Sequence, residues 1–235
     1  MIWNELNWVP SEKQLDQFIL LQELLKECNK KTNLTRLVDG DDFWIAQVCD
    51  SLLPLREELQ YPELSHEFID IGSGCGFPGV AIAIAMPNST ITLLDSSSKK
   101  TTFLKEVSKE IGLNSRITVI TERAETAGRD PILRSNFDFA IARAVASANV
   151  VAEYLVPFLK STGQALIFKG GWSEVEQEIL KKALTKLNAE ILRIHKFELP
   201  NNRGIRNILR ISSTDKCPNQ YPRSIGKPKK QPLGY

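Results

Sequence analysis

The sequence has few of the residues that build metal sites or covalent cross-links. Its four cysteines, Cys28, Cys49, Cys75 and Cys217, include no Cys-x-x-Cys pair, and it has only two histidines. Structural zinc usually takes paired ligands at short spacing, so we expect no metal site. Scattered free cysteines are typical of proteins in a reducing compartment.

Long hydrophobic runs and an excess of one charge are also missing. No apolar stretch approaches the roughly 20 residues that a membrane span needs, and the start has no signal-peptide pattern. The 30 Lys and Arg residues nearly balance the 28 Asp and Glu residues. We therefore expect a soluble, cytoplasmic monomer without a membrane partner. Any nucleic-acid binding must depend on local clusters of basic residues.

Residues 1–62 have helical periodicity and predict an N-terminal helical cap. Apolar positions recur at helical spacing from Ser11, the expected N-cap, to Cys28, and again from about Asp41 to Leu59. The recurring residues are Leu15, Phe18, Ile19, Gln22 and Leu25 in the first stretch, and Phe43, Trp44, Val48, Leu52 and Leu55, expected to face inward, in the second.

From residue 63 to 213, short apolar runs alternate with amphipathic stretches, as in βαβ units around a mainly parallel sheet. The expected strands are Glu67–Ile71, Thr90–Leu94, Ile117–Thr121, Phe137–Ala140 and Gln164–Lys169, with helices at Pro78–Ala85, Lys99–Ile111, Ala148–Leu159 and Glu174–Leu187. Glu190–Glu198 and Gly204–Ile211 have no helix between them and should pair as an antiparallel hairpin. A basic, proline-rich and partly extended tail spans 214–235, and we expect one compact unit overall.

Gly72, Gly74, Gly76 and Gly79 lie between the first strand and the next helix. Without a Cβ atom, the backbone can turn sharply and let a ligand approach its N–H groups. The last three glycines also match the dinucleotide fingerprint. Asp70 favours S-adenosylmethionine (SAM), because a carboxylate before the loop suits a cationic amino group and would repel a pyrophosphate. The terminal hairpin is also typical of methyltransferase sheets.

Two later turns fit a nucleoside. Asp95 ends the second strand, where a carboxylate can accept hydrogen bonds from ribose hydroxyls. The alternative is that Asp95 caps the following helix and has no other role. Ala124 and Glu125 lie in a turn that faces the adenine in this fold, although an ordinary polar turn would look the same. These positions predict an α/β, Rossmann-like class I SAM-dependent methyltransferase fold.

The sequence after the fourth strand restricts the atom that is methylated. Enzymes that act on exocyclic amines usually have an Asn/Asp-Pro-Pro-aromatic run there, whereas this chain has no proline and has Arg143. Cytosine C5 methylation needs a cysteine nucleophile, and neither Cys75 nor Cys217 is well placed. A ring nitrogen such as guanine N7 is already a nucleophile, so no general base is required. Arg143 could position the acceptor, or could form a structural salt bridge.

Several of these motifs resemble one family, methyltransferase G of small-subunit rRNA, formerly called glucose-inhibited division protein B. The resemblance is carried by Asp70–Gly79, Leu94–Ser96 with Lys99 and Lys100, Arg123–Glu125, Ala142–Ala144, Asn33–Thr35, Asp50–Leu52, Lys169 with Gly170, and Tyr221–Arg223. It covers nearly the whole chain. It implies transfer of methyl from SAM to N7 of a guanine (position 527, in the 530 loop) of 16S rRNA.

The resemblance also implies which residues contact the cofactor. These are Gly72, Phe77, Ala124, Glu125 and Arg143, while the segment Asp95, Ser96 and Ser97 would hold the ribose. The family usually has a histidine where this chain has Gln47. If that histidine takes part in RNA docking, its role in docking is in doubt in this chain. The substitution by Gln47 should not affect the cofactor site.

Clusters of basic residues could bind phosphates of the 16S rRNA around the cofactor cleft. They are Lys30, Lys31 and Arg36, then Arg203 and Arg206, then Arg223, Lys227, Lys229 and Lys230. Solvated surface charge is the alternative for any one of them. Two other functions stay open: an NAD-dependent oxidoreductase, and a non-catalytic RNA-binding module on a methyltransferase fold.

Overall fold

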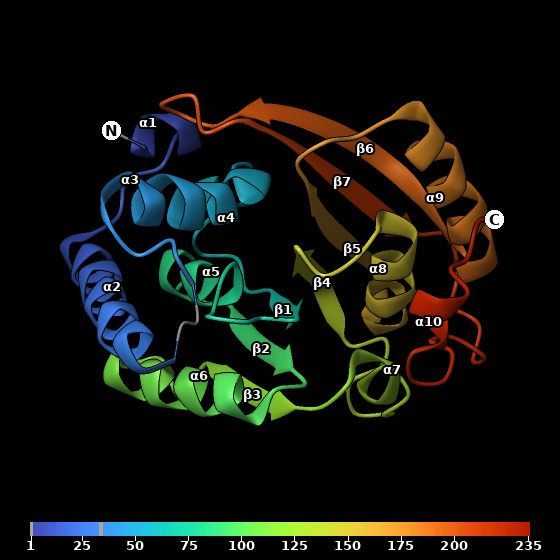
Figure 1. The fold of residues 1–235 in the computed structure, drawn as a ribbon, viewed down its shortest axis with the longest axis horizontal. Coiled ribbons are helices and arrows are strands. Elements are labelled where there is room, and N and C mark those ends of the chain that lie inside the picture. Colours follow the sequence, from blue (N-terminus) through green and yellow to red (C-terminus); the bar gives the residue numbers. More distant parts are fainter. Residues whose placement is uncertain (1, 33–34) are drawn as a thin grey trace.

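A seven-stranded sheet forms the centre of the computed structural model, which describes residues 2–32 and 35–235 (Figure 1). The strands are β1 Glu67–Ile71, β2 Thr90–Asp95, β3 Ile117–Thr121, β4 Phe137–Arg143, β5 Leu159–Lys169, β6 Ala189–Glu198 and β7 Ile205–Ser213. Their order is β3-β2-β1-β4-β5-β7-β6, and only β7 and β6 run antiparallel to their neighbours. The predicted parallel sheet with a terminal hairpin is therefore confirmed. Asn33, Leu34 and the side chain of Lys31 lie outside the described residues.

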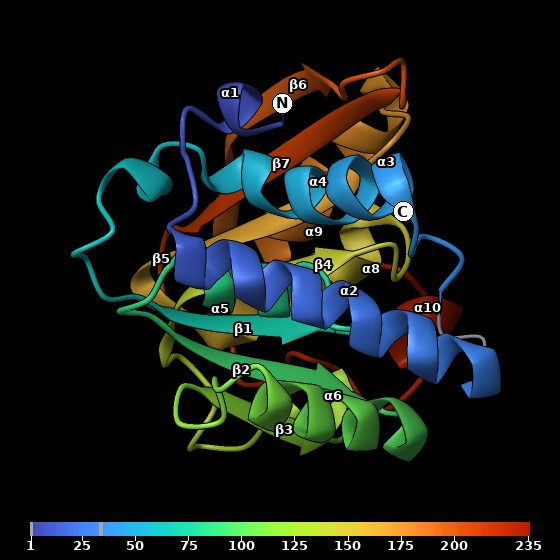
Figure 2. The same ribbon diagram turned by 90° about the vertical axis from the view of Figure 1, so that its left-hand side faces the viewer.

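Helices cover both faces of this sheet (Figures 1 and 2). One face carries α5 Gly79–Ala85 and α6 Ser98–Glu110, with α2 Glu12–Thr32 packed outside them. The other face carries α8 Ala148–Leu155, the 3-10 helix Val156–Phe158 and α9 Glu174–Leu187. Three short helices are α1 Trp3–Leu6, α7 Ala124–Ala127 and α10 Lys227–Lys230. In the described part of the chain, no helix is both long and apolar enough to cross a bilayer.

The first predicted helix forms, with a different buried stripe. Ser11 and Gln14 cap α2 reciprocally: the Ser11 hydroxyl oxygen accepts from the Gln14 amide at 3.3 Å, and Gln14 Oε1 accepts from the Ser11 amide at 2.9 Å. Leu15 and Ile19, which belong to the recurring pattern of the sequence, are 37% and 41% exposed. Leu21 is fully buried instead, because the face toward α5 and α6 passes through Phe18, Leu21 and Leu25.

The second predicted helix is divided into short pieces. They are α3 Gly40–Phe43, a π-helix at Trp44–Cys49, α4 Asp50–Leu52, and 3-10 helices at Leu53–Leu55 and Glu58–Gln60. Four of the five residues predicted to face inward, Phe43, Val48, Leu52 and Leu55, are fully buried. A π-helix widens the turn and often occurs at functional sites. Here it carries Gln47, which is 1% exposed, toward the carboxyl ends of the strands.

The tail differs most from its prediction. Residues 215–235, which we call the C-terminal strap, fold back against α8 and include α10 (Figure 1). Cys217, Tyr221 and Leu233 of the strap are buried in the same apolar cluster as α8 and α9. The segment predicted as partly extended is therefore packed onto the domain.

A buried ion pair joins the sheet to the N-terminal helices and gives a test of their coupling. Arg210 of β7 is 5% exposed. Its guanidinium contacts Glu58 Oε1 at 2.6 Å and the carbonyl oxygen of Pro54 at 2.7 Å. We expect Arg210→Ala to lower the free energy of unfolding in urea by about 3–5 kcal/mol, because Glu58, whose side chain is 14% exposed, and the Pro54 carbonyl lose their donor.

The matched control is the neighbouring pair of Arg193 and Glu57, whose side chains are 34% and 63% exposed. Arg193→Ala should lower the free energy of unfolding by less than about 1 kcal/mol, as for other exposed pairs. Equal decreases in the free energy of unfolding for the two variants would show that the pair of Arg210 and Glu58 does not join the sheet to the N-terminal helices.

Candidate functional site

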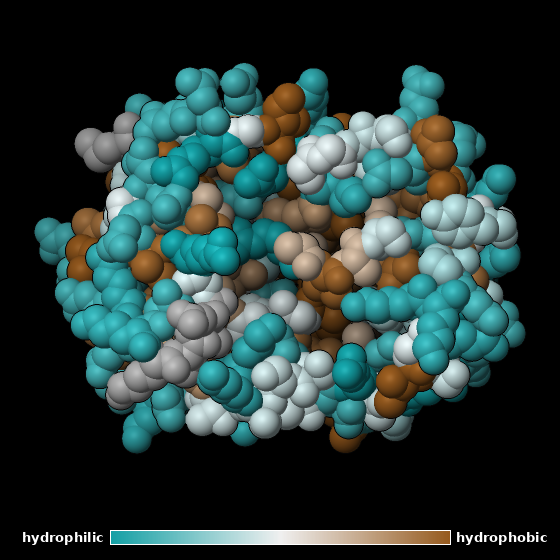
Figure 3. Space-filling view, in the orientation of Figure 1, coloured by the Kyte–Doolittle hydropathy of each residue, from teal (hydrophilic) through white to brown (hydrophobic). Residues whose placement is uncertain are grey.

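Three neighbouring strands end side by side at the middle of the molecule. The end residues of β1, β2 and β4 are Ile71, Asp95 and Arg143, and β1 lies between β2 and β4. The chain leaves β1 and β4 toward opposite faces, so the loops diverge here and open a crevice, where ligands bind in open α/β sheets. The space-filling view shows a hollow there, with hydrophobic residues on the side toward α8 (Figure 3).

The crevice holds two adjacent cavities. The first cavity, of about 540 Å³, is lined among others by Thr35, Gln47, Asp50, Gly74, Phe77 and Arg206. The second cavity, of about 420 Å³, is lined among others by Asp95, Ser96, Ala124, Glu125, Ile225, Gly226 and Lys229. Both share Gly72, Lys100, Arg143 and Ala144. The structure thus brings together most of the predicted cofactor residues, while Asp70 and Ser97 line neither cavity.

The glycine loop owes its shape to left-handed backbone conformations. Gly72, Gly74 and Gly76 have φ angles of 75°, 59° and 100°. Residues with a Cβ atom rarely adopt these backbone angles. Gly79 has another role, since a Cβ atom there would lie 2.3 Å from Leu93. It allows α5 to pack closely on β2, whereas Gly72 and Gly74 line the crevice. Gly76 is buried, and a Cβ atom there would lie 2.8 Å from Val80.

Asp70 lies behind the loop. Its Oδ2 accepts a hydrogen bond from the Gly79 amide at 2.9 Å, and no described residue donates to its buried Oδ1. Burial raises the pKa of Asp70 to about 7, against the lowering effects of the Gly79 amide and of Arg143. The geometry therefore gives Asp70 the task of joining the loop to α5. Asp70 lines neither cavity, and its contact with a cationic ligand, direct or through water, stays a prediction from the sequence.

Asp95 orders the start of the following helix, one of the two tasks considered for it, and binding of ribose hydroxyls stays a prediction. Its two carboxylate oxygens accept from the Gly74 amide at 3.0 Å and from the Ser97 amide at 2.9 Å. It therefore orders the glycine loop and the start of α6 together. Lys100 lies 3.6 Å away, and the Asp95 side chain is 7% exposed, at the wall of the second cavity.

Glu125 carries a nearly buried carboxylate to the far side of the second cavity. The residue is 5% exposed, and its Oε1 accepts from the Gly226 amide at 3.0 Å. The Tyr154 hydroxyl lies 3.5 Å from the same oxygen. Burial, and then the Glu125 charge, raise the pKa of Tyr154 to about 12, so this phenol stays a neutral donor. Ala124 begins α7 beside it and lines the same cavity.

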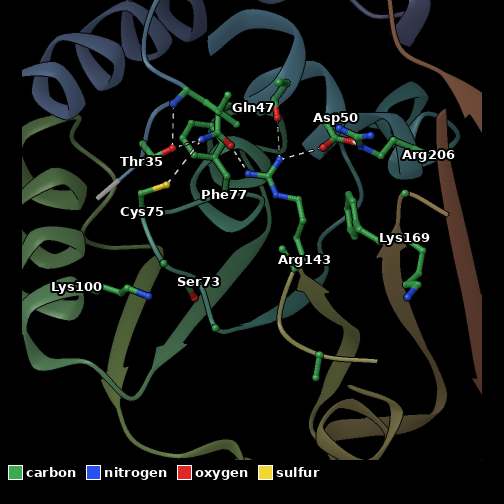
Figure 4. A pocket seen from close by; sticks show the side chains of 18 of the residues that line it. Thr35, Gln47, Asp50, Ser73, Cys75, Phe77, Lys100, Arg143, Lys169 and Arg206 are labelled. Atoms are coloured by element: carbon green, nitrogen blue, oxygen red, sulfur yellow. Dashed lines mark hydrogen bonds and ion pairs between the residues drawn. The ribbon is translucent and has the colours of Figure 1, made fainter. Parts of the chain in front are cut away.

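Arg143 connects the strand ends to the N-terminal helices (Figure 4). Its guanidinium donates to the Ala46 carbonyl at 3.0 Å, to Asp50 Oδ2 at 3.2 Å and to Gln47 Oε1. It also lies 5.9 Å from the centre of the Phe77 ring. The salt bridge considered from the sequence exists, and Arg143 still lines both cavities.

The other side of this network was missed by the sequence reasoning. Gln47 Nε2 donates to the Thr35 hydroxyl at 3.3 Å and lies 3.9 Å from Cys75 Sγ. Asp50 also accepts from Arg206 Nε at 3.1 Å. The available signals were the motif that begins at Asp50 and the unusual Gln47, but neither indicated a contact with Arg143. Burial raises the pKa of the Cys75 thiol, which therefore stays neutral rather than nucleophilic.

Several of the predicted RNA-binding arginines have partners within the chain. Arg206 pairs with Asp50, Arg203 with Asp42, and Arg223 with Glu153, whose side chain is 0% exposed. Arg223 was therefore a wrong choice as a free phosphate ligand, because its charge neutralises a buried carboxylate. Of the basic residues predicted to bind RNA, those exposed in the described part of the chain are Lys30, Arg36, Lys227, Lys229 and Lys230.

Comparison with known proteins gives a consistent result. Residues 14–208 match the family model described as rRNA small subunit methyltransferase G. A protein named ribosomal RNA small subunit methyltransferase G from Prochlorococcus marinus (strain NATL2A) is 85% identical over 100% of this chain and 95% of its own length. One with the same name from Parasynechococcus marenigrum (strain WH8102) is 50% identical over 99% of this chain and 94% of its own.

Solved structures of low identity share the fold. The branched-chain polyamine synthase of Thermus thermophilus aligns with a TM-score of 0.58 at 13% identity, over 86% of this chain and 65% of its own. The ribosomal protein L11 methylase of Lactobacillus delbrueckii subsp. bulgaricus aligns with a TM-score of 0.52 at 17% identity, over 72% and 79%. These likenesses support the class I fold.

The burial of Asp70 predicts a dependence of stability on pH. Its pKa of about 7 in the folded chain exceeds the ordinary 3.8, so between these values the folded state binds more protons than the unfolded state. Stability should therefore fall as pH rises, by at most about 1.4 kcal/mol per pH unit. In Asp70→Asn, which keeps an acceptor for Gly79, this fall should be absent. Urea unfolding from pH 5 to 8 measures the difference, and parallel curves for the two proteins would contradict it.

Proposed function

The chain belongs to the rRNA small subunit methyltransferase G family, and on this premise we propose that it methylates N7 of a guanine in 16S rRNA (position 527, in the 530 loop), with SAM as donor. The observation that carries the proposal is the pair of adjacent cavities at the ends of β1, β2 and β4. One cavity has the lining of a nucleoside site, and the other is lined by Arg143, Lys169 and Arg206 among others. Ribosomal RNA as substrate also supports a cytoplasmic location.

The residues of the second cavity fit the nucleoside part of SAM. The glycine loop offers backbone to the ligand at Gly72, which lines both cavities, and at Gly74, which lines the first. A Cβ atom at Gly72 would lie 2.9 Å from Val145. Asp95 and the following Ser96 and Ser97 would hold the ribose, as carboxylates do at this position of doubly wound sheets. Ala124 and Glu125 would face the base, and Phe77 would cover the methionine side from the first cavity.

The first cavity has the features needed to align an acceptor base. When bound, SAM supplies an electrophilic methyl group on a sulfonium. The guanine N7 lone pair forms the new bond to carbon as the bond to sulfur breaks, and no proton has to be removed. The chain therefore needs only to orient the base and exclude water, which supports Arg143 as a positioning group held by Gln47 and Asp50. The neutral thiol of Cys75 fits this direct transfer.

The decisive experiment is transfer of labelled methyl from SAM to RNA. The purified chain is incubated with SAM and either 30S subunits or free 16S rRNA that lacks the modification, and the methylated nucleotide is mapped by mass spectrometry. We expect a single N7-methylguanosine in the 530 loop. SAM binding without transfer to either RNA would favour a non-catalytic binding module, and binding of NAD instead of SAM would favour the oxidoreductase.

Arg143 offers a residue-level test of acceptor positioning. Arg143→Lys keeps the charge, but a single ammonium cannot reach Ala46, Gln47 and Asp50 together. Because misplacement by about 1 Å can cost roughly 100-fold in rate, we expect kcat to fall by about 10- to 100-fold. Single-turnover methylation measures the effect. The control is Arg203→Lys, since Arg203 pairs with Asp42 and lines neither cavity, and equal rates for both variants would refute the assignment.

A further inference from the structure

The C-terminal strap is held to the domain by buried polar contacts. Arg134 donates to the carbonyl oxygens of Cys217 and Tyr221, each at 2.7 Å. Arg223 Nη2 lies 2.6 Å from an oxygen of Glu153 on α8, and that glutamate is 0% exposed. A buried carboxylate that lost its cation would cost several kcal/mol, so the ion pair fixes the start of the strap in one position.

The end of the strap is fixed as well. Asn149 donates to the carbonyl oxygen of Leu233 at 2.6 Å. A Cβ atom on Gly234 would lie 2.1 Å from the carbonyl oxygen of Ile179, so the backbone itself is seated against α9. The strap follows the last residue, 208, that matches the family model.

Between these two anchors, the strap forms part of the second cavity. Ile225, Gly226 and Lys229 line it, opposite the ends of β1 and β2. The Gly226 amide donates to Glu125 Oε1 at 3.0 Å, which links the strap directly to the carboxylate on the cavity wall. Without the strap, Glu125 would lose this donor, and the cavity would be open on that side.

The chemistry of this lining suits a purine with an amino group. Leu94, Val145 and Ile225 supply apolar surface for a flat ring. Glu125 supplies a carboxylate, and no described residue donates to its Oε2, because the contacts of Gly226 and Tyr154 both go to Oε1. A carboxylate oxygen held in this way can accept from an exocyclic amine and disfavours a carbonyl at the same position.

We propose that the strap is the outer wall of the adenine subsite, with Ile225 and Lys229 covering the base and the Gly226 amide orienting Glu125 toward the adenine amino group. This assignment rests on the proposed use of SAM. It gives the strap a part in cofactor binding, in addition to any contact of its lysines with RNA. Cofactor affinity then depends on residues that follow the last strand of the sheet.

The test compares two matched double variants. Ile225→Ala with Lys229→Ala removes the covering side chains, and Ile132→Ala with Lys230→Ala removes the same residue types outside the cavity. Ile225 and Ile132 are 60% and 77% exposed, and both lysines are exposed, so neither variant should lower Tm appreciably. Calorimetry with S-adenosylhomocysteine should give a Kd about tenfold higher for the first variant, from lost apolar contact, and about the wild-type Kd for the second.

A second probe identifies which part of the ligand the strap contacts. 5′-Methylthioadenosine has the base and ribose but no amino-acid part, so the first variant should lose the same factor for it as for S-adenosylhomocysteine. Equal binding by the first variant and the wild type, or a loss confined to S-adenosylhomocysteine, would overturn the assignment while leaving the proposed function intact. Failure of the wild type to bind S-adenosylhomocysteine would instead overturn the proposed function, and the assignment with it.

Discussion

The position of the Arg143 guanidinium is the constraint on which the cleft depends. It stands at the end of β4 and bonds to the backbone of Ala46 and the side chains of Gln47 and Asp50, so it attaches the N-terminal helices to the sheet. Asp50 is also bonded by Arg206 of β7, which extends the network to the hairpin. Because Asp50 is buried between two cations, loss of either cation would weaken the whole wall. The group that lines both cavities is therefore also the group that holds one wall in place.

Most of the sheet and the loop side of the site could be predicted from the sequence. Strands β1 and β3 begin and end at the predicted residues, because both are short apolar runs bounded by polar turns. Once the strands are known, parallel topology brings their carboxyl ends to one edge, so Asp95 and Glu125 had to lie near the glycine loop. The prediction ended β4 at Ala140 rather than Arg143, a small error that hid the position of the arginine at the strand end.

The rest could not be predicted, because it depends on contacts between distant residues. Arg143 and Asp50 are 93 positions apart, and no local pattern pairs them. Arg223 looks like any basic tail residue, and only the fold shows that it neutralises the buried Glu153. The sequence shows how many charged side chains a segment has, but it does not show which of these side chains are buried in the fold. For the same reason, the sequence overestimated how much basic surface is free to bind phosphates.

The two ends of the chain contribute what the central sheet cannot provide. The carboxyl edge of a parallel sheet is open. The short loops at this edge can contact one side of a ligand but cannot enclose it. Segments outside the sheet must therefore supply the walls. The π-helix before β1 does this for the first cavity, through Gln47, and the strap after β7 does it for the second, through Ile225 and Gly226. Since many enzymes share this sheet, selectivity for base and acceptor is expected to reside in these two appended segments.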